Sequence, residues 1–219
     1  MTPADSYKHK GLRRKLVETL KGKGIRDENV LSAIGALPRH WFFESAFWDH
    51  AYQDKAFPIG NGQTISQPYT VAFMTELLDV KAGDHILEIG TGSGYQAAIL
   101  SLLGASVYTV ECISELHESA KNTLETIGIE AVNFLLADGS KGWAENAPYD
   151  KIIVTAASPA IPAPLMEQLK IGGKLVIPLG DRNQQRMTRM TKTGQKKAER
   201  ETFGHFRFVP LVGENGWED

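Results

Sequence analysis

The stretch of sequence that decides the fold is Leu87-Glu-Ile-Gly-Thr-Gly-Ser-Gly-Tyr-Gln96, in which a short apolar run leads into three glycines. Gly90, Gly92 and Gly94 allow the backbone to turn tightly and to approach a ligand closely. The loop leads into a helical pattern, so we expect it to join a buried strand to a helix N-terminus, where α/β proteins bind nucleotides. The spacing is G-x-G-x-G, and Tyr95 stands where the third glycine of a dinucleotide site would be. A nucleoside without a pyrophosphate therefore fits this loop better.

The chain on either side of this loop alternates short apolar runs with helical patterns. Strands are predicted at residues 85–89, 106–110, 132–136, 151–155 and 174–178, and helices at 95–103, 114–127 and 164–169. Such alternation is typical of parallel βαβ units with right-handed crossovers. Residues 186–193 and 202–209 flank a polar turn that contains Gly194, which predicts an antiparallel hairpin. The predicted fold class is α/β: a doubly wound, Rossmann-like sheet that is mostly parallel and ends in a C-terminal antiparallel hairpin.

Residues 1–80 have a different pattern and are expected to form an N-terminal helical and loop extension. Helices are predicted at 6–22 and 27–37, the second with Asp27 as its N-cap and Pro38 as its stop. Residues 40–57 are dense in aromatic side chains, which we interpret as core and lid packing. A loop at 59–68 follows, and Pro68 suits the first turn of a further helix. The extension should pack on a core of residues 81–219, which gives one compact domain overall.

Composition limits the classes of function. The 219 residues include 24 Lys and Arg against 26 Asp and Glu, a net charge of −2, which argues against a nucleic-acid binder. The basic run Lys192, Lys196, Lys197 and Arg200 is interleaved with acidic residues and is interpreted as a solvated turn. A single cysteine, Cys112, excludes a disulfide framework and a multi-cysteine zinc site, and we expect it to be a small buried residue.

The expected setting of the protein follows from the same observations. The sequence shows no metal-spaced histidine pair and no apolar run suited to a secretory signal or a membrane span. We therefore expect a cytoplasmic protein that binds no metal, no nucleic acid and no membrane. Nothing in the sequence requires an oligomer, so a monomer is expected.

Carboxylates follow the next two predicted strands. Glu111 ends the second strand, 21 residues past Gly90, where a carboxylate can accept hydrogen bonds from both ribose hydroxyls. Asp138 and Gly139 follow the third strand, where an Asp can accept from an adenine amino group. With the glycine loop, these features predict a pocket for the methyl donor S-adenosylmethionine, and so a class I methyltransferase fold. The candidate cofactor-binding residues are Glu88, Gly90, Thr91, Gly92, Ser93, Gly94, Glu111, Asp138, Gly139 and Thr155.

The sequence resembles the protein-L-isoaspartate (D-aspartate) O-methyltransferases from about Pro38 to Gly213. The resemblance is carried by residues 56–68, 87–96, 107–111, 148–157 and 172–178. The specific part is Gln63-Thr-Ile-Ser-Gln-Pro68, which methyltransferases in general do not share. The resemblance implies that Ser66 is the active-site serine. It also implies that Thr64, Ile65, Ser66, Val209 and Pro210 contact the substrate.

The resemblance further implies the reaction. S-adenosylmethionine would methylate the free carboxylate of an L-isoaspartyl or D-aspartyl residue in a damaged protein or peptide, leaving S-adenosylhomocysteine. The methyl ester then collapses to a succinimide that reopens in part to normal aspartate, so the activity is repair. Two positions depart from the family pattern: Cys112 stands where Arg is usual, and Ala137 stands where Gly is usual. Both departures concern details of the adenosine pocket.

The chemistry requires little of the chain beyond alignment. A carboxylate with a pKa near ~4 is already ionised at neutral pH, so no general base is needed. Holding oxygen, methyl and sulfur in line can supply roughly 7–11 kcal/mol in favourable cases. Ser66 is therefore interpreted as a positioning hydrogen-bond donor and not as a nucleophile. The small residues Thr155-Ala-Ala157 are candidates for lining the acceptor pocket.

Three alternatives remain open from the sequence. A class I methyltransferase acting on a small molecule or RNA would share the glycine loop, Glu111 and Asp138, but has no reason to carry residues 60–68. A nicotinamide-dependent oxidoreductase is disfavoured by the missing third glycine. A non-catalytic S-adenosylmethionine-binding protein is disfavoured by the presence of Ser66, and measurable turnover would exclude it.

Overall fold

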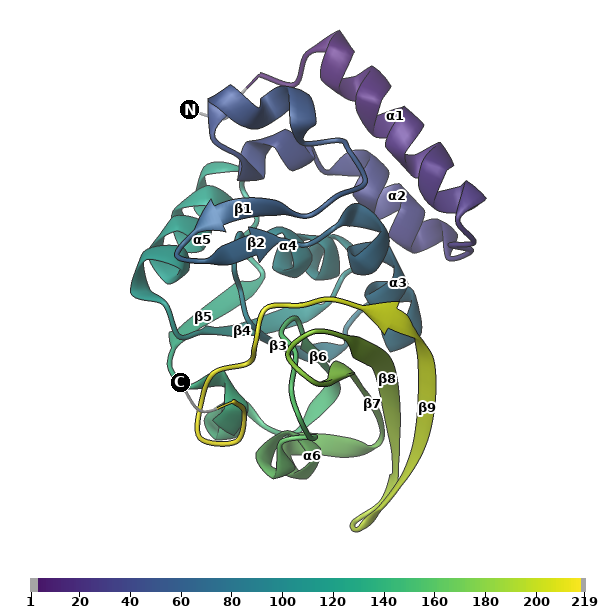
Figure 1. The fold of residues 1–219 in the computed structure, drawn as a ribbon, viewed down its shortest axis with the longest axis vertical. Helices are drawn as coiled ribbons and strands as arrows, with labels where there is room; N and C mark the ends of the chain where they lie inside the picture. The colour runs from purple at the N-terminus through teal and green to yellow at the C-terminus, as the bar shows by residue number, and fades with distance from the viewer. Residues whose placement is uncertain (1–3, 218–219) are drawn as a thin grey trace.

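The computed structural model describes residues 4–217 and centres on a seven-stranded sheet (Figure 1). The strand order across the sheet is β5-β4-β3-β6-β7-β8-β9. The strands are β3 (His85–Ile89), β4 (Ser106–Glu111), β5 (Val132–Leu136), β6 (Tyr149–Val154), β7 (Leu169–Gly180), β8 (Gln185–Gly194) and β9 (Lys197–Phe206). The first five are parallel, and β8 and β9 are antiparallel to their neighbours. The predicted fold class is confirmed.

The order of the strands places a crevice beside β3. The chain builds outward from β3 through β4 to β5, and then returns to the other side of β3 to form β6. Loops that leave β3 and β6 at their carboxyl ends therefore separate, which is where open α/β sheets bind ligands. The connecting helices are α4 (Tyr95–Leu102), α5 (Ser114–Thr126) and α6 (Ala163–Gln168).

Alternating side chains of each strand build two cores. Ile86 and Ile153 belong to the core that also contains residues of α3, α4 and the N-terminal helices. Leu87 and Ile152, their direct neighbours in sequence, belong to the core on the opposite face, which includes Leu165 of α6. This is the period of two that a strand buried on both faces requires.

The N-terminal extension contains α1 (Tyr7–Gly22), α2 (Glu28–Ala36), the 3-10 helices η1 (Arg39–Phe42) and η2 (Ser45–His50), and α3 (Pro68–Leu78). Figure 1 shows α1 and α2 at one end of the molecule and the β8–β9 hairpin reaching away at the other. The Asp27 side chain accepts hydrogen bonds from the Asn29 and Val30 amides, so the predicted N-cap is confirmed. Within residues 4–217, none of the helices has the length and apolar character needed to cross a membrane.

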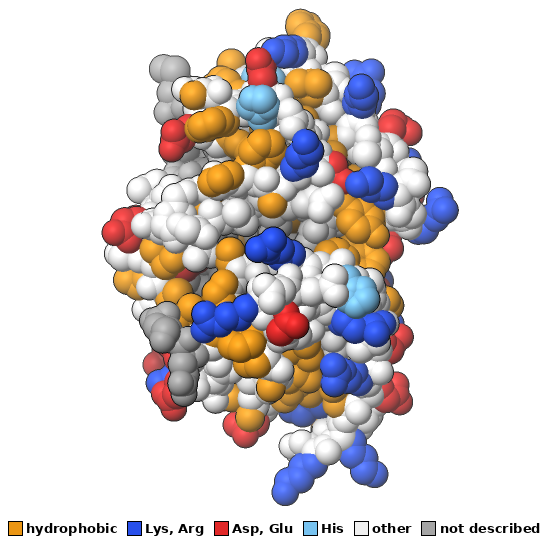
Figure 2. All heavy atoms as spheres, in the orientation of Figure 1, with side chains coloured by type: hydrophobic (Ala, Val, Ile, Leu, Met, Phe, Trp, Pro, Cys, Tyr) orange, Lys and Arg blue, Asp and Glu red, His pale blue; other side chains and the backbone are white. Residues whose placement is uncertain are grey.

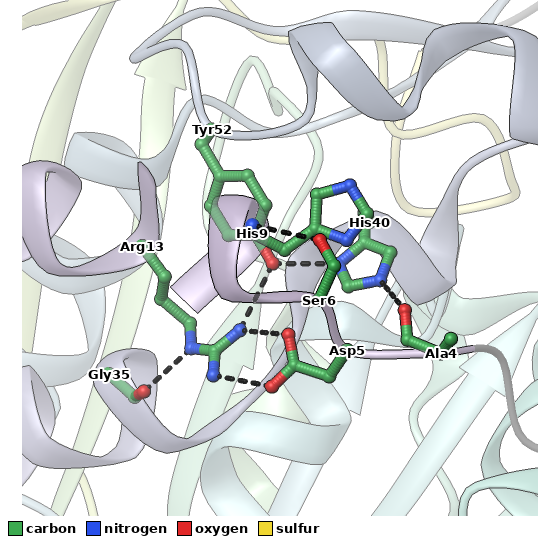
Figure 3. A network of polar contacts seen from close by, with 8 residues as sticks. All are labelled: Ala4, Asp5, Ser6, His9, Arg13, Gly35, His40 and Tyr52. Atoms are coloured by element: carbon green, nitrogen blue, oxygen red, sulfur yellow. Dashed lines mark hydrogen bonds and ion pairs between the residues drawn. The ribbon is translucent and has the colours of Figure 1, made fainter. Parts of the chain in front are cut away.

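A polar network fastens the start of the chain to this extension (Figure 3). The Arg13 guanidinium donates to both carboxylate oxygens of Asp5, at 3.1 and 2.9 Å, and to the Tyr52 hydroxyl at 3.2 Å. His40 Nδ1 lies 2.7 Å from that hydroxyl, and its Nε2 lies 3.2 Å from the Ala4 carbonyl oxygen. The His9 and His40 ring centroids are 3.9 Å apart. Burial lowers the pKa of His40, so the neutral imidazole is the form that fits here.

Three local expectations are wrong. The segment 59–68, expected as a loop, contains an antiparallel hairpin of β1 (Phe57–Gly60) and β2 (Gln63–Ile65). Asn61 and Gly62 both have positive φ, the backbone that an Asn-Gly hairpin turn requires. Cys112 is exposed because the chain leaves the sheet directly after β4. Lys192 is buried because its ammonium donates to the Met166 and Leu169 carbonyls, both at 2.6 Å.

The surface agrees with a near-neutral chain. In Figure 2, basic and acidic side chains are interspersed over the visible face, and basic side chains mark the tip of the β8–β9 hairpin. Lys196 and Lys197 at this turn are exposed, as the interpretation of a solvated turn expects.

Candidate functional site

The glycine loop touches the end of β6 at its first glycine. Gly90 has φ +92°, and a Cβ atom added there would lie 2.5 Å from the Thr155 hydroxyl oxygen. The Thr155 amide donates to the Ile89 carbonyl at 2.9 Å, and its hydroxyl donates to the Gly90 carbonyl at 2.6 Å. The strand ends of β3 and β6 are thus fixed to one another, which leaves the backbone of the loop facing the crevice.

Glu111 is held rigidly at the end of β4. One carboxylate oxygen accepts from the Gly92 amide at 2.9 Å, and the other accepts from the Cys112 and Ile113 amides at 2.9 and 3.0 Å. The side chain is buried, with 6% of its surface exposed. Each carboxylate oxygen can accept more than one hydrogen bond, so vicinal hydroxyls of a ribose can share these oxygens.

The hairpin of β1 and β2 brings Ser66 to the same crevice. Ile65 is buried and anchors the hairpin, whereas Thr64 is exposed and Ser66 is half-buried. Opposite them, the segment that follows β9 is fixed to the end of β6. The Ala157 amide donates to the Val209 carbonyl at 2.8 Å, and the Leu211 amide donates to the Ala157 carbonyl at 2.7 Å.

These segments enclose a cavity of about 440 Å³. That volume is within the range of small-molecule and cofactor sites. Most of the predicted site residues line it: Thr64, Ile65, Ser66, Gly90, Thr91, Gly92, Ser93, Glu111, Gly139, Thr155, Val209 and Pro210. Glu111 is the only charged residue among the described residues that line this cavity, and none of them is Lys or Arg. A cavity with these walls suits a nucleoside and an amino-acid tail better than a phosphate.

Sequence reasoning missed several lining residues. Tyr95 and Gln96, at the start of α4, face the cavity, as do Cys112 and Ile113 after β4. All four follow the predicted strand ends by a few positions. The rule that ligands bind at carboxyl ends of strands could have included them.

Glu88 and Gly94 were predicted to bind the cofactor, but neither lines the cavity. Glu88 is fully buried and accepts from the Thr109 hydroxyl at 2.6 Å, and that hydroxyl is 2.6 Å from the Thr91 hydroxyl. Burial raises the pKa of Glu88 to about 8. Gly94 caps α4, close to the Ala120 side chain. Both positions therefore support the loop from behind.

Asp138 also lies outside the cavity wall, which Gly139 forms instead. The Asp138 carboxylate accepts from the Ser140 and Glu214 amides, both at 2.9 Å. Although burial disfavours the charge, these amides hold the pKa of Asp138 below its ordinary value. The carboxylate thus joins the end of β5 to the C-terminal segment.

One group outside the cavity has metal-ligating side chains. Asp5, His9 and His40 place one potential ligand atom each within 4.8 Å of one another. Both carboxylate oxygens of Asp5 already accept from Arg13, and both ring nitrogens of His40 have protein partners (Figure 3). We therefore interpret this group as the anchor of the N-terminus.

Comparisons with known proteins agree with this geometry. Residues 11–216 match the family described as protein-L-isoaspartate(D-aspartate) O-methyltransferase. Proteins named protein-L-isoaspartate O-methyltransferase from Cytophaga hutchinsonii and Dictyoglomus thermophilum are 56% and 55% identical to the chain. Each of these alignments covers 97% of the chain and 96% of the relative.

Solved structures give the same fold. A protein-L-isoaspartate O-methyltransferase superposes with a TM-score of 0.85 at 31% identity, covering 93% of this chain and 67% of the other. A Plasmodium falciparum protein, described as a candidate protein-L-isoaspartate O-methyltransferase and solved with S-adenosyl-L-homocysteine, superposes with a TM-score of 0.80 at 23% identity. This superposition covers 91% of this chain and 98% of the other. The second likeness is one of fold alone.

Proposed function

The chain belongs to the protein-L-isoaspartate(D-aspartate) O-methyltransferase family, and from this premise we propose that its 440 Å³ cavity is where it methylates the free carboxylate of L-isoaspartyl residues in damaged proteins and peptides. S-adenosylmethionine supplies the methyl group and leaves as S-adenosylhomocysteine. The observation that carries the proposal is that the Ser66 hairpin and the glycine loop with Glu111 face one cavity. A donor site and an acceptor site must be adjacent for direct transfer.

The walls of the cavity fit the donor. Glu111 would hold the ribose hydroxyls, and the backbone of Gly90 to Ser93 would face the amino-acid tail. Gly139 would lie beside the adenine, and Thr155 would keep the loop at its distance from β6. We assign Asp138 and Glu88 indirect roles: Asp138 places Gly139, and Glu88 places Thr91 through Thr109.

The acceptor side needs orientation rather than a base. An isoaspartyl carboxylate is ionised at neutral pH and is itself the nucleophile. We propose that the Ser66 hydroxyl donates a hydrogen bond to it, and that Thr64, Ile65, Val209 and Pro210 hold the adjoining peptide. The half-burial of Ser66 supports this role, because a site that excludes water strengthens such contacts. D-aspartyl residues present the same carboxylate and are proposed as further acceptors.

We propose that residues 1–80 are the acceptor-side extension and that residues 81–219 are the donor-binding core. The first three and the last two residues of these ranges lie outside the described residues. We also propose a cytoplasmic monomer. The exposed thiol of Cys112 supports a reducing compartment. Light scattering at several concentrations tests the monomer, and cell fractionation tests the compartment.

The deciding experiment uses two peptides that differ only in aspartate against isoaspartate. The purified chain receives S-adenosylmethionine labelled on the methyl group, and label is measured on each peptide. We expect base-labile label on the isoaspartyl peptide alone. Label on the aspartyl peptide, or on neither peptide, would overturn the proposal. Label on total RNA, or on small molecules of a cell extract, would favour the alternative methyltransferase.

A further inference from the structure

Arg39 is the largest side chain that the structure buries completely. It lies in η1, outside the cavity lining, and its guanidinium donates hydrogen bonds to two main-chain carbonyls. Nε donates to the Ala51 carbonyl at 2.9 Å, and Nη2 donates to the Ser66 carbonyl at 2.9 Å. One buried side chain thus joins the aromatic segment to the residue proposed to orient the acceptor.

This cation is buried without a paired anion. Among residues 4–217, no carboxylate forms an ion pair with Arg39, and its Nη1 atom is buried without a hydrogen-bond partner. The guanidinium carbon lies 4.7 Å from the centroid of the Tyr95 ring and 5.4 Å from that of Phe43. Burial lowers the pKa of Arg39 to about 10, so the charge persists at neutral pH. Burial of a charge without an ion pair costs stability, and here two main-chain hydrogen bonds and two aromatic rings offset part of that cost.

Arg39 contacts two residues that line the cavity. Tyr95, against which the guanidinium packs, lines the cavity, and so does Ser66. The cavity wall itself contains no cationic side chain among the described residues, although its proposed acceptor is an anion. The hydrogen bond to the Ser66 carbonyl is the direct link by which a buried cation reaches the acceptor side.

We propose that Arg39 is a positioning residue of the acceptor site: by holding the Ser66 carbonyl, it fixes the direction of the Ser66 hydroxyl toward the substrate carboxylate. The inference rests on the proposed function. It assigns Arg39 no contact with substrate and no part in donor binding. Lysine cannot replace it, because a single ammonium lacks the planar fork that reaches the Ala51 and Ser66 carbonyls together.

The test compares Arg39→Lys and Arg39→Gln with a matched control, Arg13→Lys. Arg13 is also buried and also joins segments of the extension, but its contacts are with Gly35, Asp5 and Tyr52 and not with Ser66. Each variant is assayed with the isoaspartyl peptide for kcat and KM, with calorimetry for donor affinity, and with urea unfolding for stability. Both Arg39 changes are repeated in a Ser66→Ala background.

We expect the Arg39 variants to lose roughly tenfold or more in kcat/KM for the peptide, while donor Kd changes less than twofold. In the Ser66→Ala background, the further loss should shrink to about twofold or less, because the group that Arg39 orients is gone. Arg13→Lys should lower stability and leave kcat/KM within about twofold.

The opposite results would overturn the inference. Equal losses with and without the Ser66 hydroxyl, equal losses of donor affinity, or an equal kinetic loss in Arg13→Lys would each show a merely structural role. If Arg39→Lys does not fold, Arg39→Gln in the same cycle decides the matter. If neither folds, Arg39 is required for stability and the positioning role is rejected. A Ser66→Ala loss below twofold in the otherwise unchanged chain also rejects the inference, because there is then no hydroxyl effect to position. Failure of the proposed function is separate, because it would appear as no turnover of the isoaspartyl peptide by the unaltered chain.

Discussion

Gly90→Ala tests the contact between the glycine loop and Thr155, at the end of β6. Gly90 has φ +92°, and the new methyl group would lie 2.5 Å from the Thr155 hydroxyl oxygen, closer than any real contact permits. That hydroxyl must therefore rotate away from the Gly90 carbonyl, to which it donates at 2.6 Å. The substitution should lower the free energy of unfolding through two separate effects, backbone strain at residue 90 and loss of the Thr155 hydrogen bond.

The two effects contribute different free energies. A residue with a Cβ atom in the left-handed region costs about 1–2 kcal/mol. Loss of the Thr155 hydrogen bond costs about 1 kcal/mol more. We therefore expect Gly90→Ala to lower the free energy of unfolding by about 2–3 kcal/mol. In a Thr155→Ala background the clash is absent, so the same change should cost only the strain, about 1–2 kcal/mol.

Urea unfolding of the four chains of this cycle measures both quantities, and calorimetry measures donor affinity in the same samples. Gly172→Ala is the control, because Gly172 has φ +85° and nothing within 4 Å of its added Cβ atom. It should cost the strain alone and leave donor affinity unchanged. A Gly90→Ala cost that is the same with and without the Thr155 hydroxyl would refute the reasoning.

Three further outcomes are expected. Ser66→Ala should lower kcat for the isoaspartyl peptide by roughly tenfold or more while donor Kd stays within about twofold, measured by methyl transfer and calorimetry. Burial raises the pKa of Glu88 to about 8, so this carboxyl contributes stability below its ordinary pKa and loses that contribution as the pH rises through the folded value. Glu88→Gln should therefore reduce the fall in the free energy of unfolding between about pH 5 and 8. Burial lowers the pKa of His40, so the neutral imidazole contributes stability above its ordinary pKa of about 6.5, and this contribution is lost as the pH falls through the folded value. His40→Gln should therefore reduce the fall in the free energy of unfolding below about pH 6.5. Urea unfolding across this pH range measures both slopes.

Contrary results for these variants are equally specific. A Ser66→Ala chain that loses donor affinity and turnover in parallel would place the serine in the donor site. An unchanged pH slope in Glu88→Gln would mean that this carboxyl is ionised in the folded chain. An unchanged acid slope in His40→Gln would remove His40 from the anchor of the N-terminus.

The prediction from sequence was strongest where the signal is local. The bounds of β3 and β5 were predicted to the residue, and most other elements differ by one or two positions. Alternation of apolar runs and glycines determines strands and turns within a few residues of chain, so no distant partner is needed. The hairpin of β1 and β2 is harder to predict: Asn61-Gly62 is a local turn signal, but its strands are short and the surrounding glycine and polar residues are typical of a loop.

In the candidate site too, the sequence located the residues whose position depends on local signals. Glu111 and the glycine loop could be located because both follow strand ends, and strand ends of a parallel sheet meet at one edge. Asp138 follows a strand end as well, but its carboxylate accepts a hydrogen bond from the amide of Glu214, which is distant in sequence. Its departure from the cavity wall could not be predicted, because that contact forms only when the C-terminal segment returns to the sheet.

The sequence by itself determined the α/β fold, the position of the glycine loop and the family, because periodicity and motif spacing are properties of neighbouring residues. Only the tertiary structure decided which side chains face the cavity and which support it. Lys192 lies in a basic run yet is buried, and Arg39 follows a proline in an ordinary aromatic segment yet holds the Ser66 carbonyl. Burial and hydrogen bonding at such positions are set by segments distant in the chain, and the energy of a buried charge depends on those surroundings rather than on its sequence neighbours.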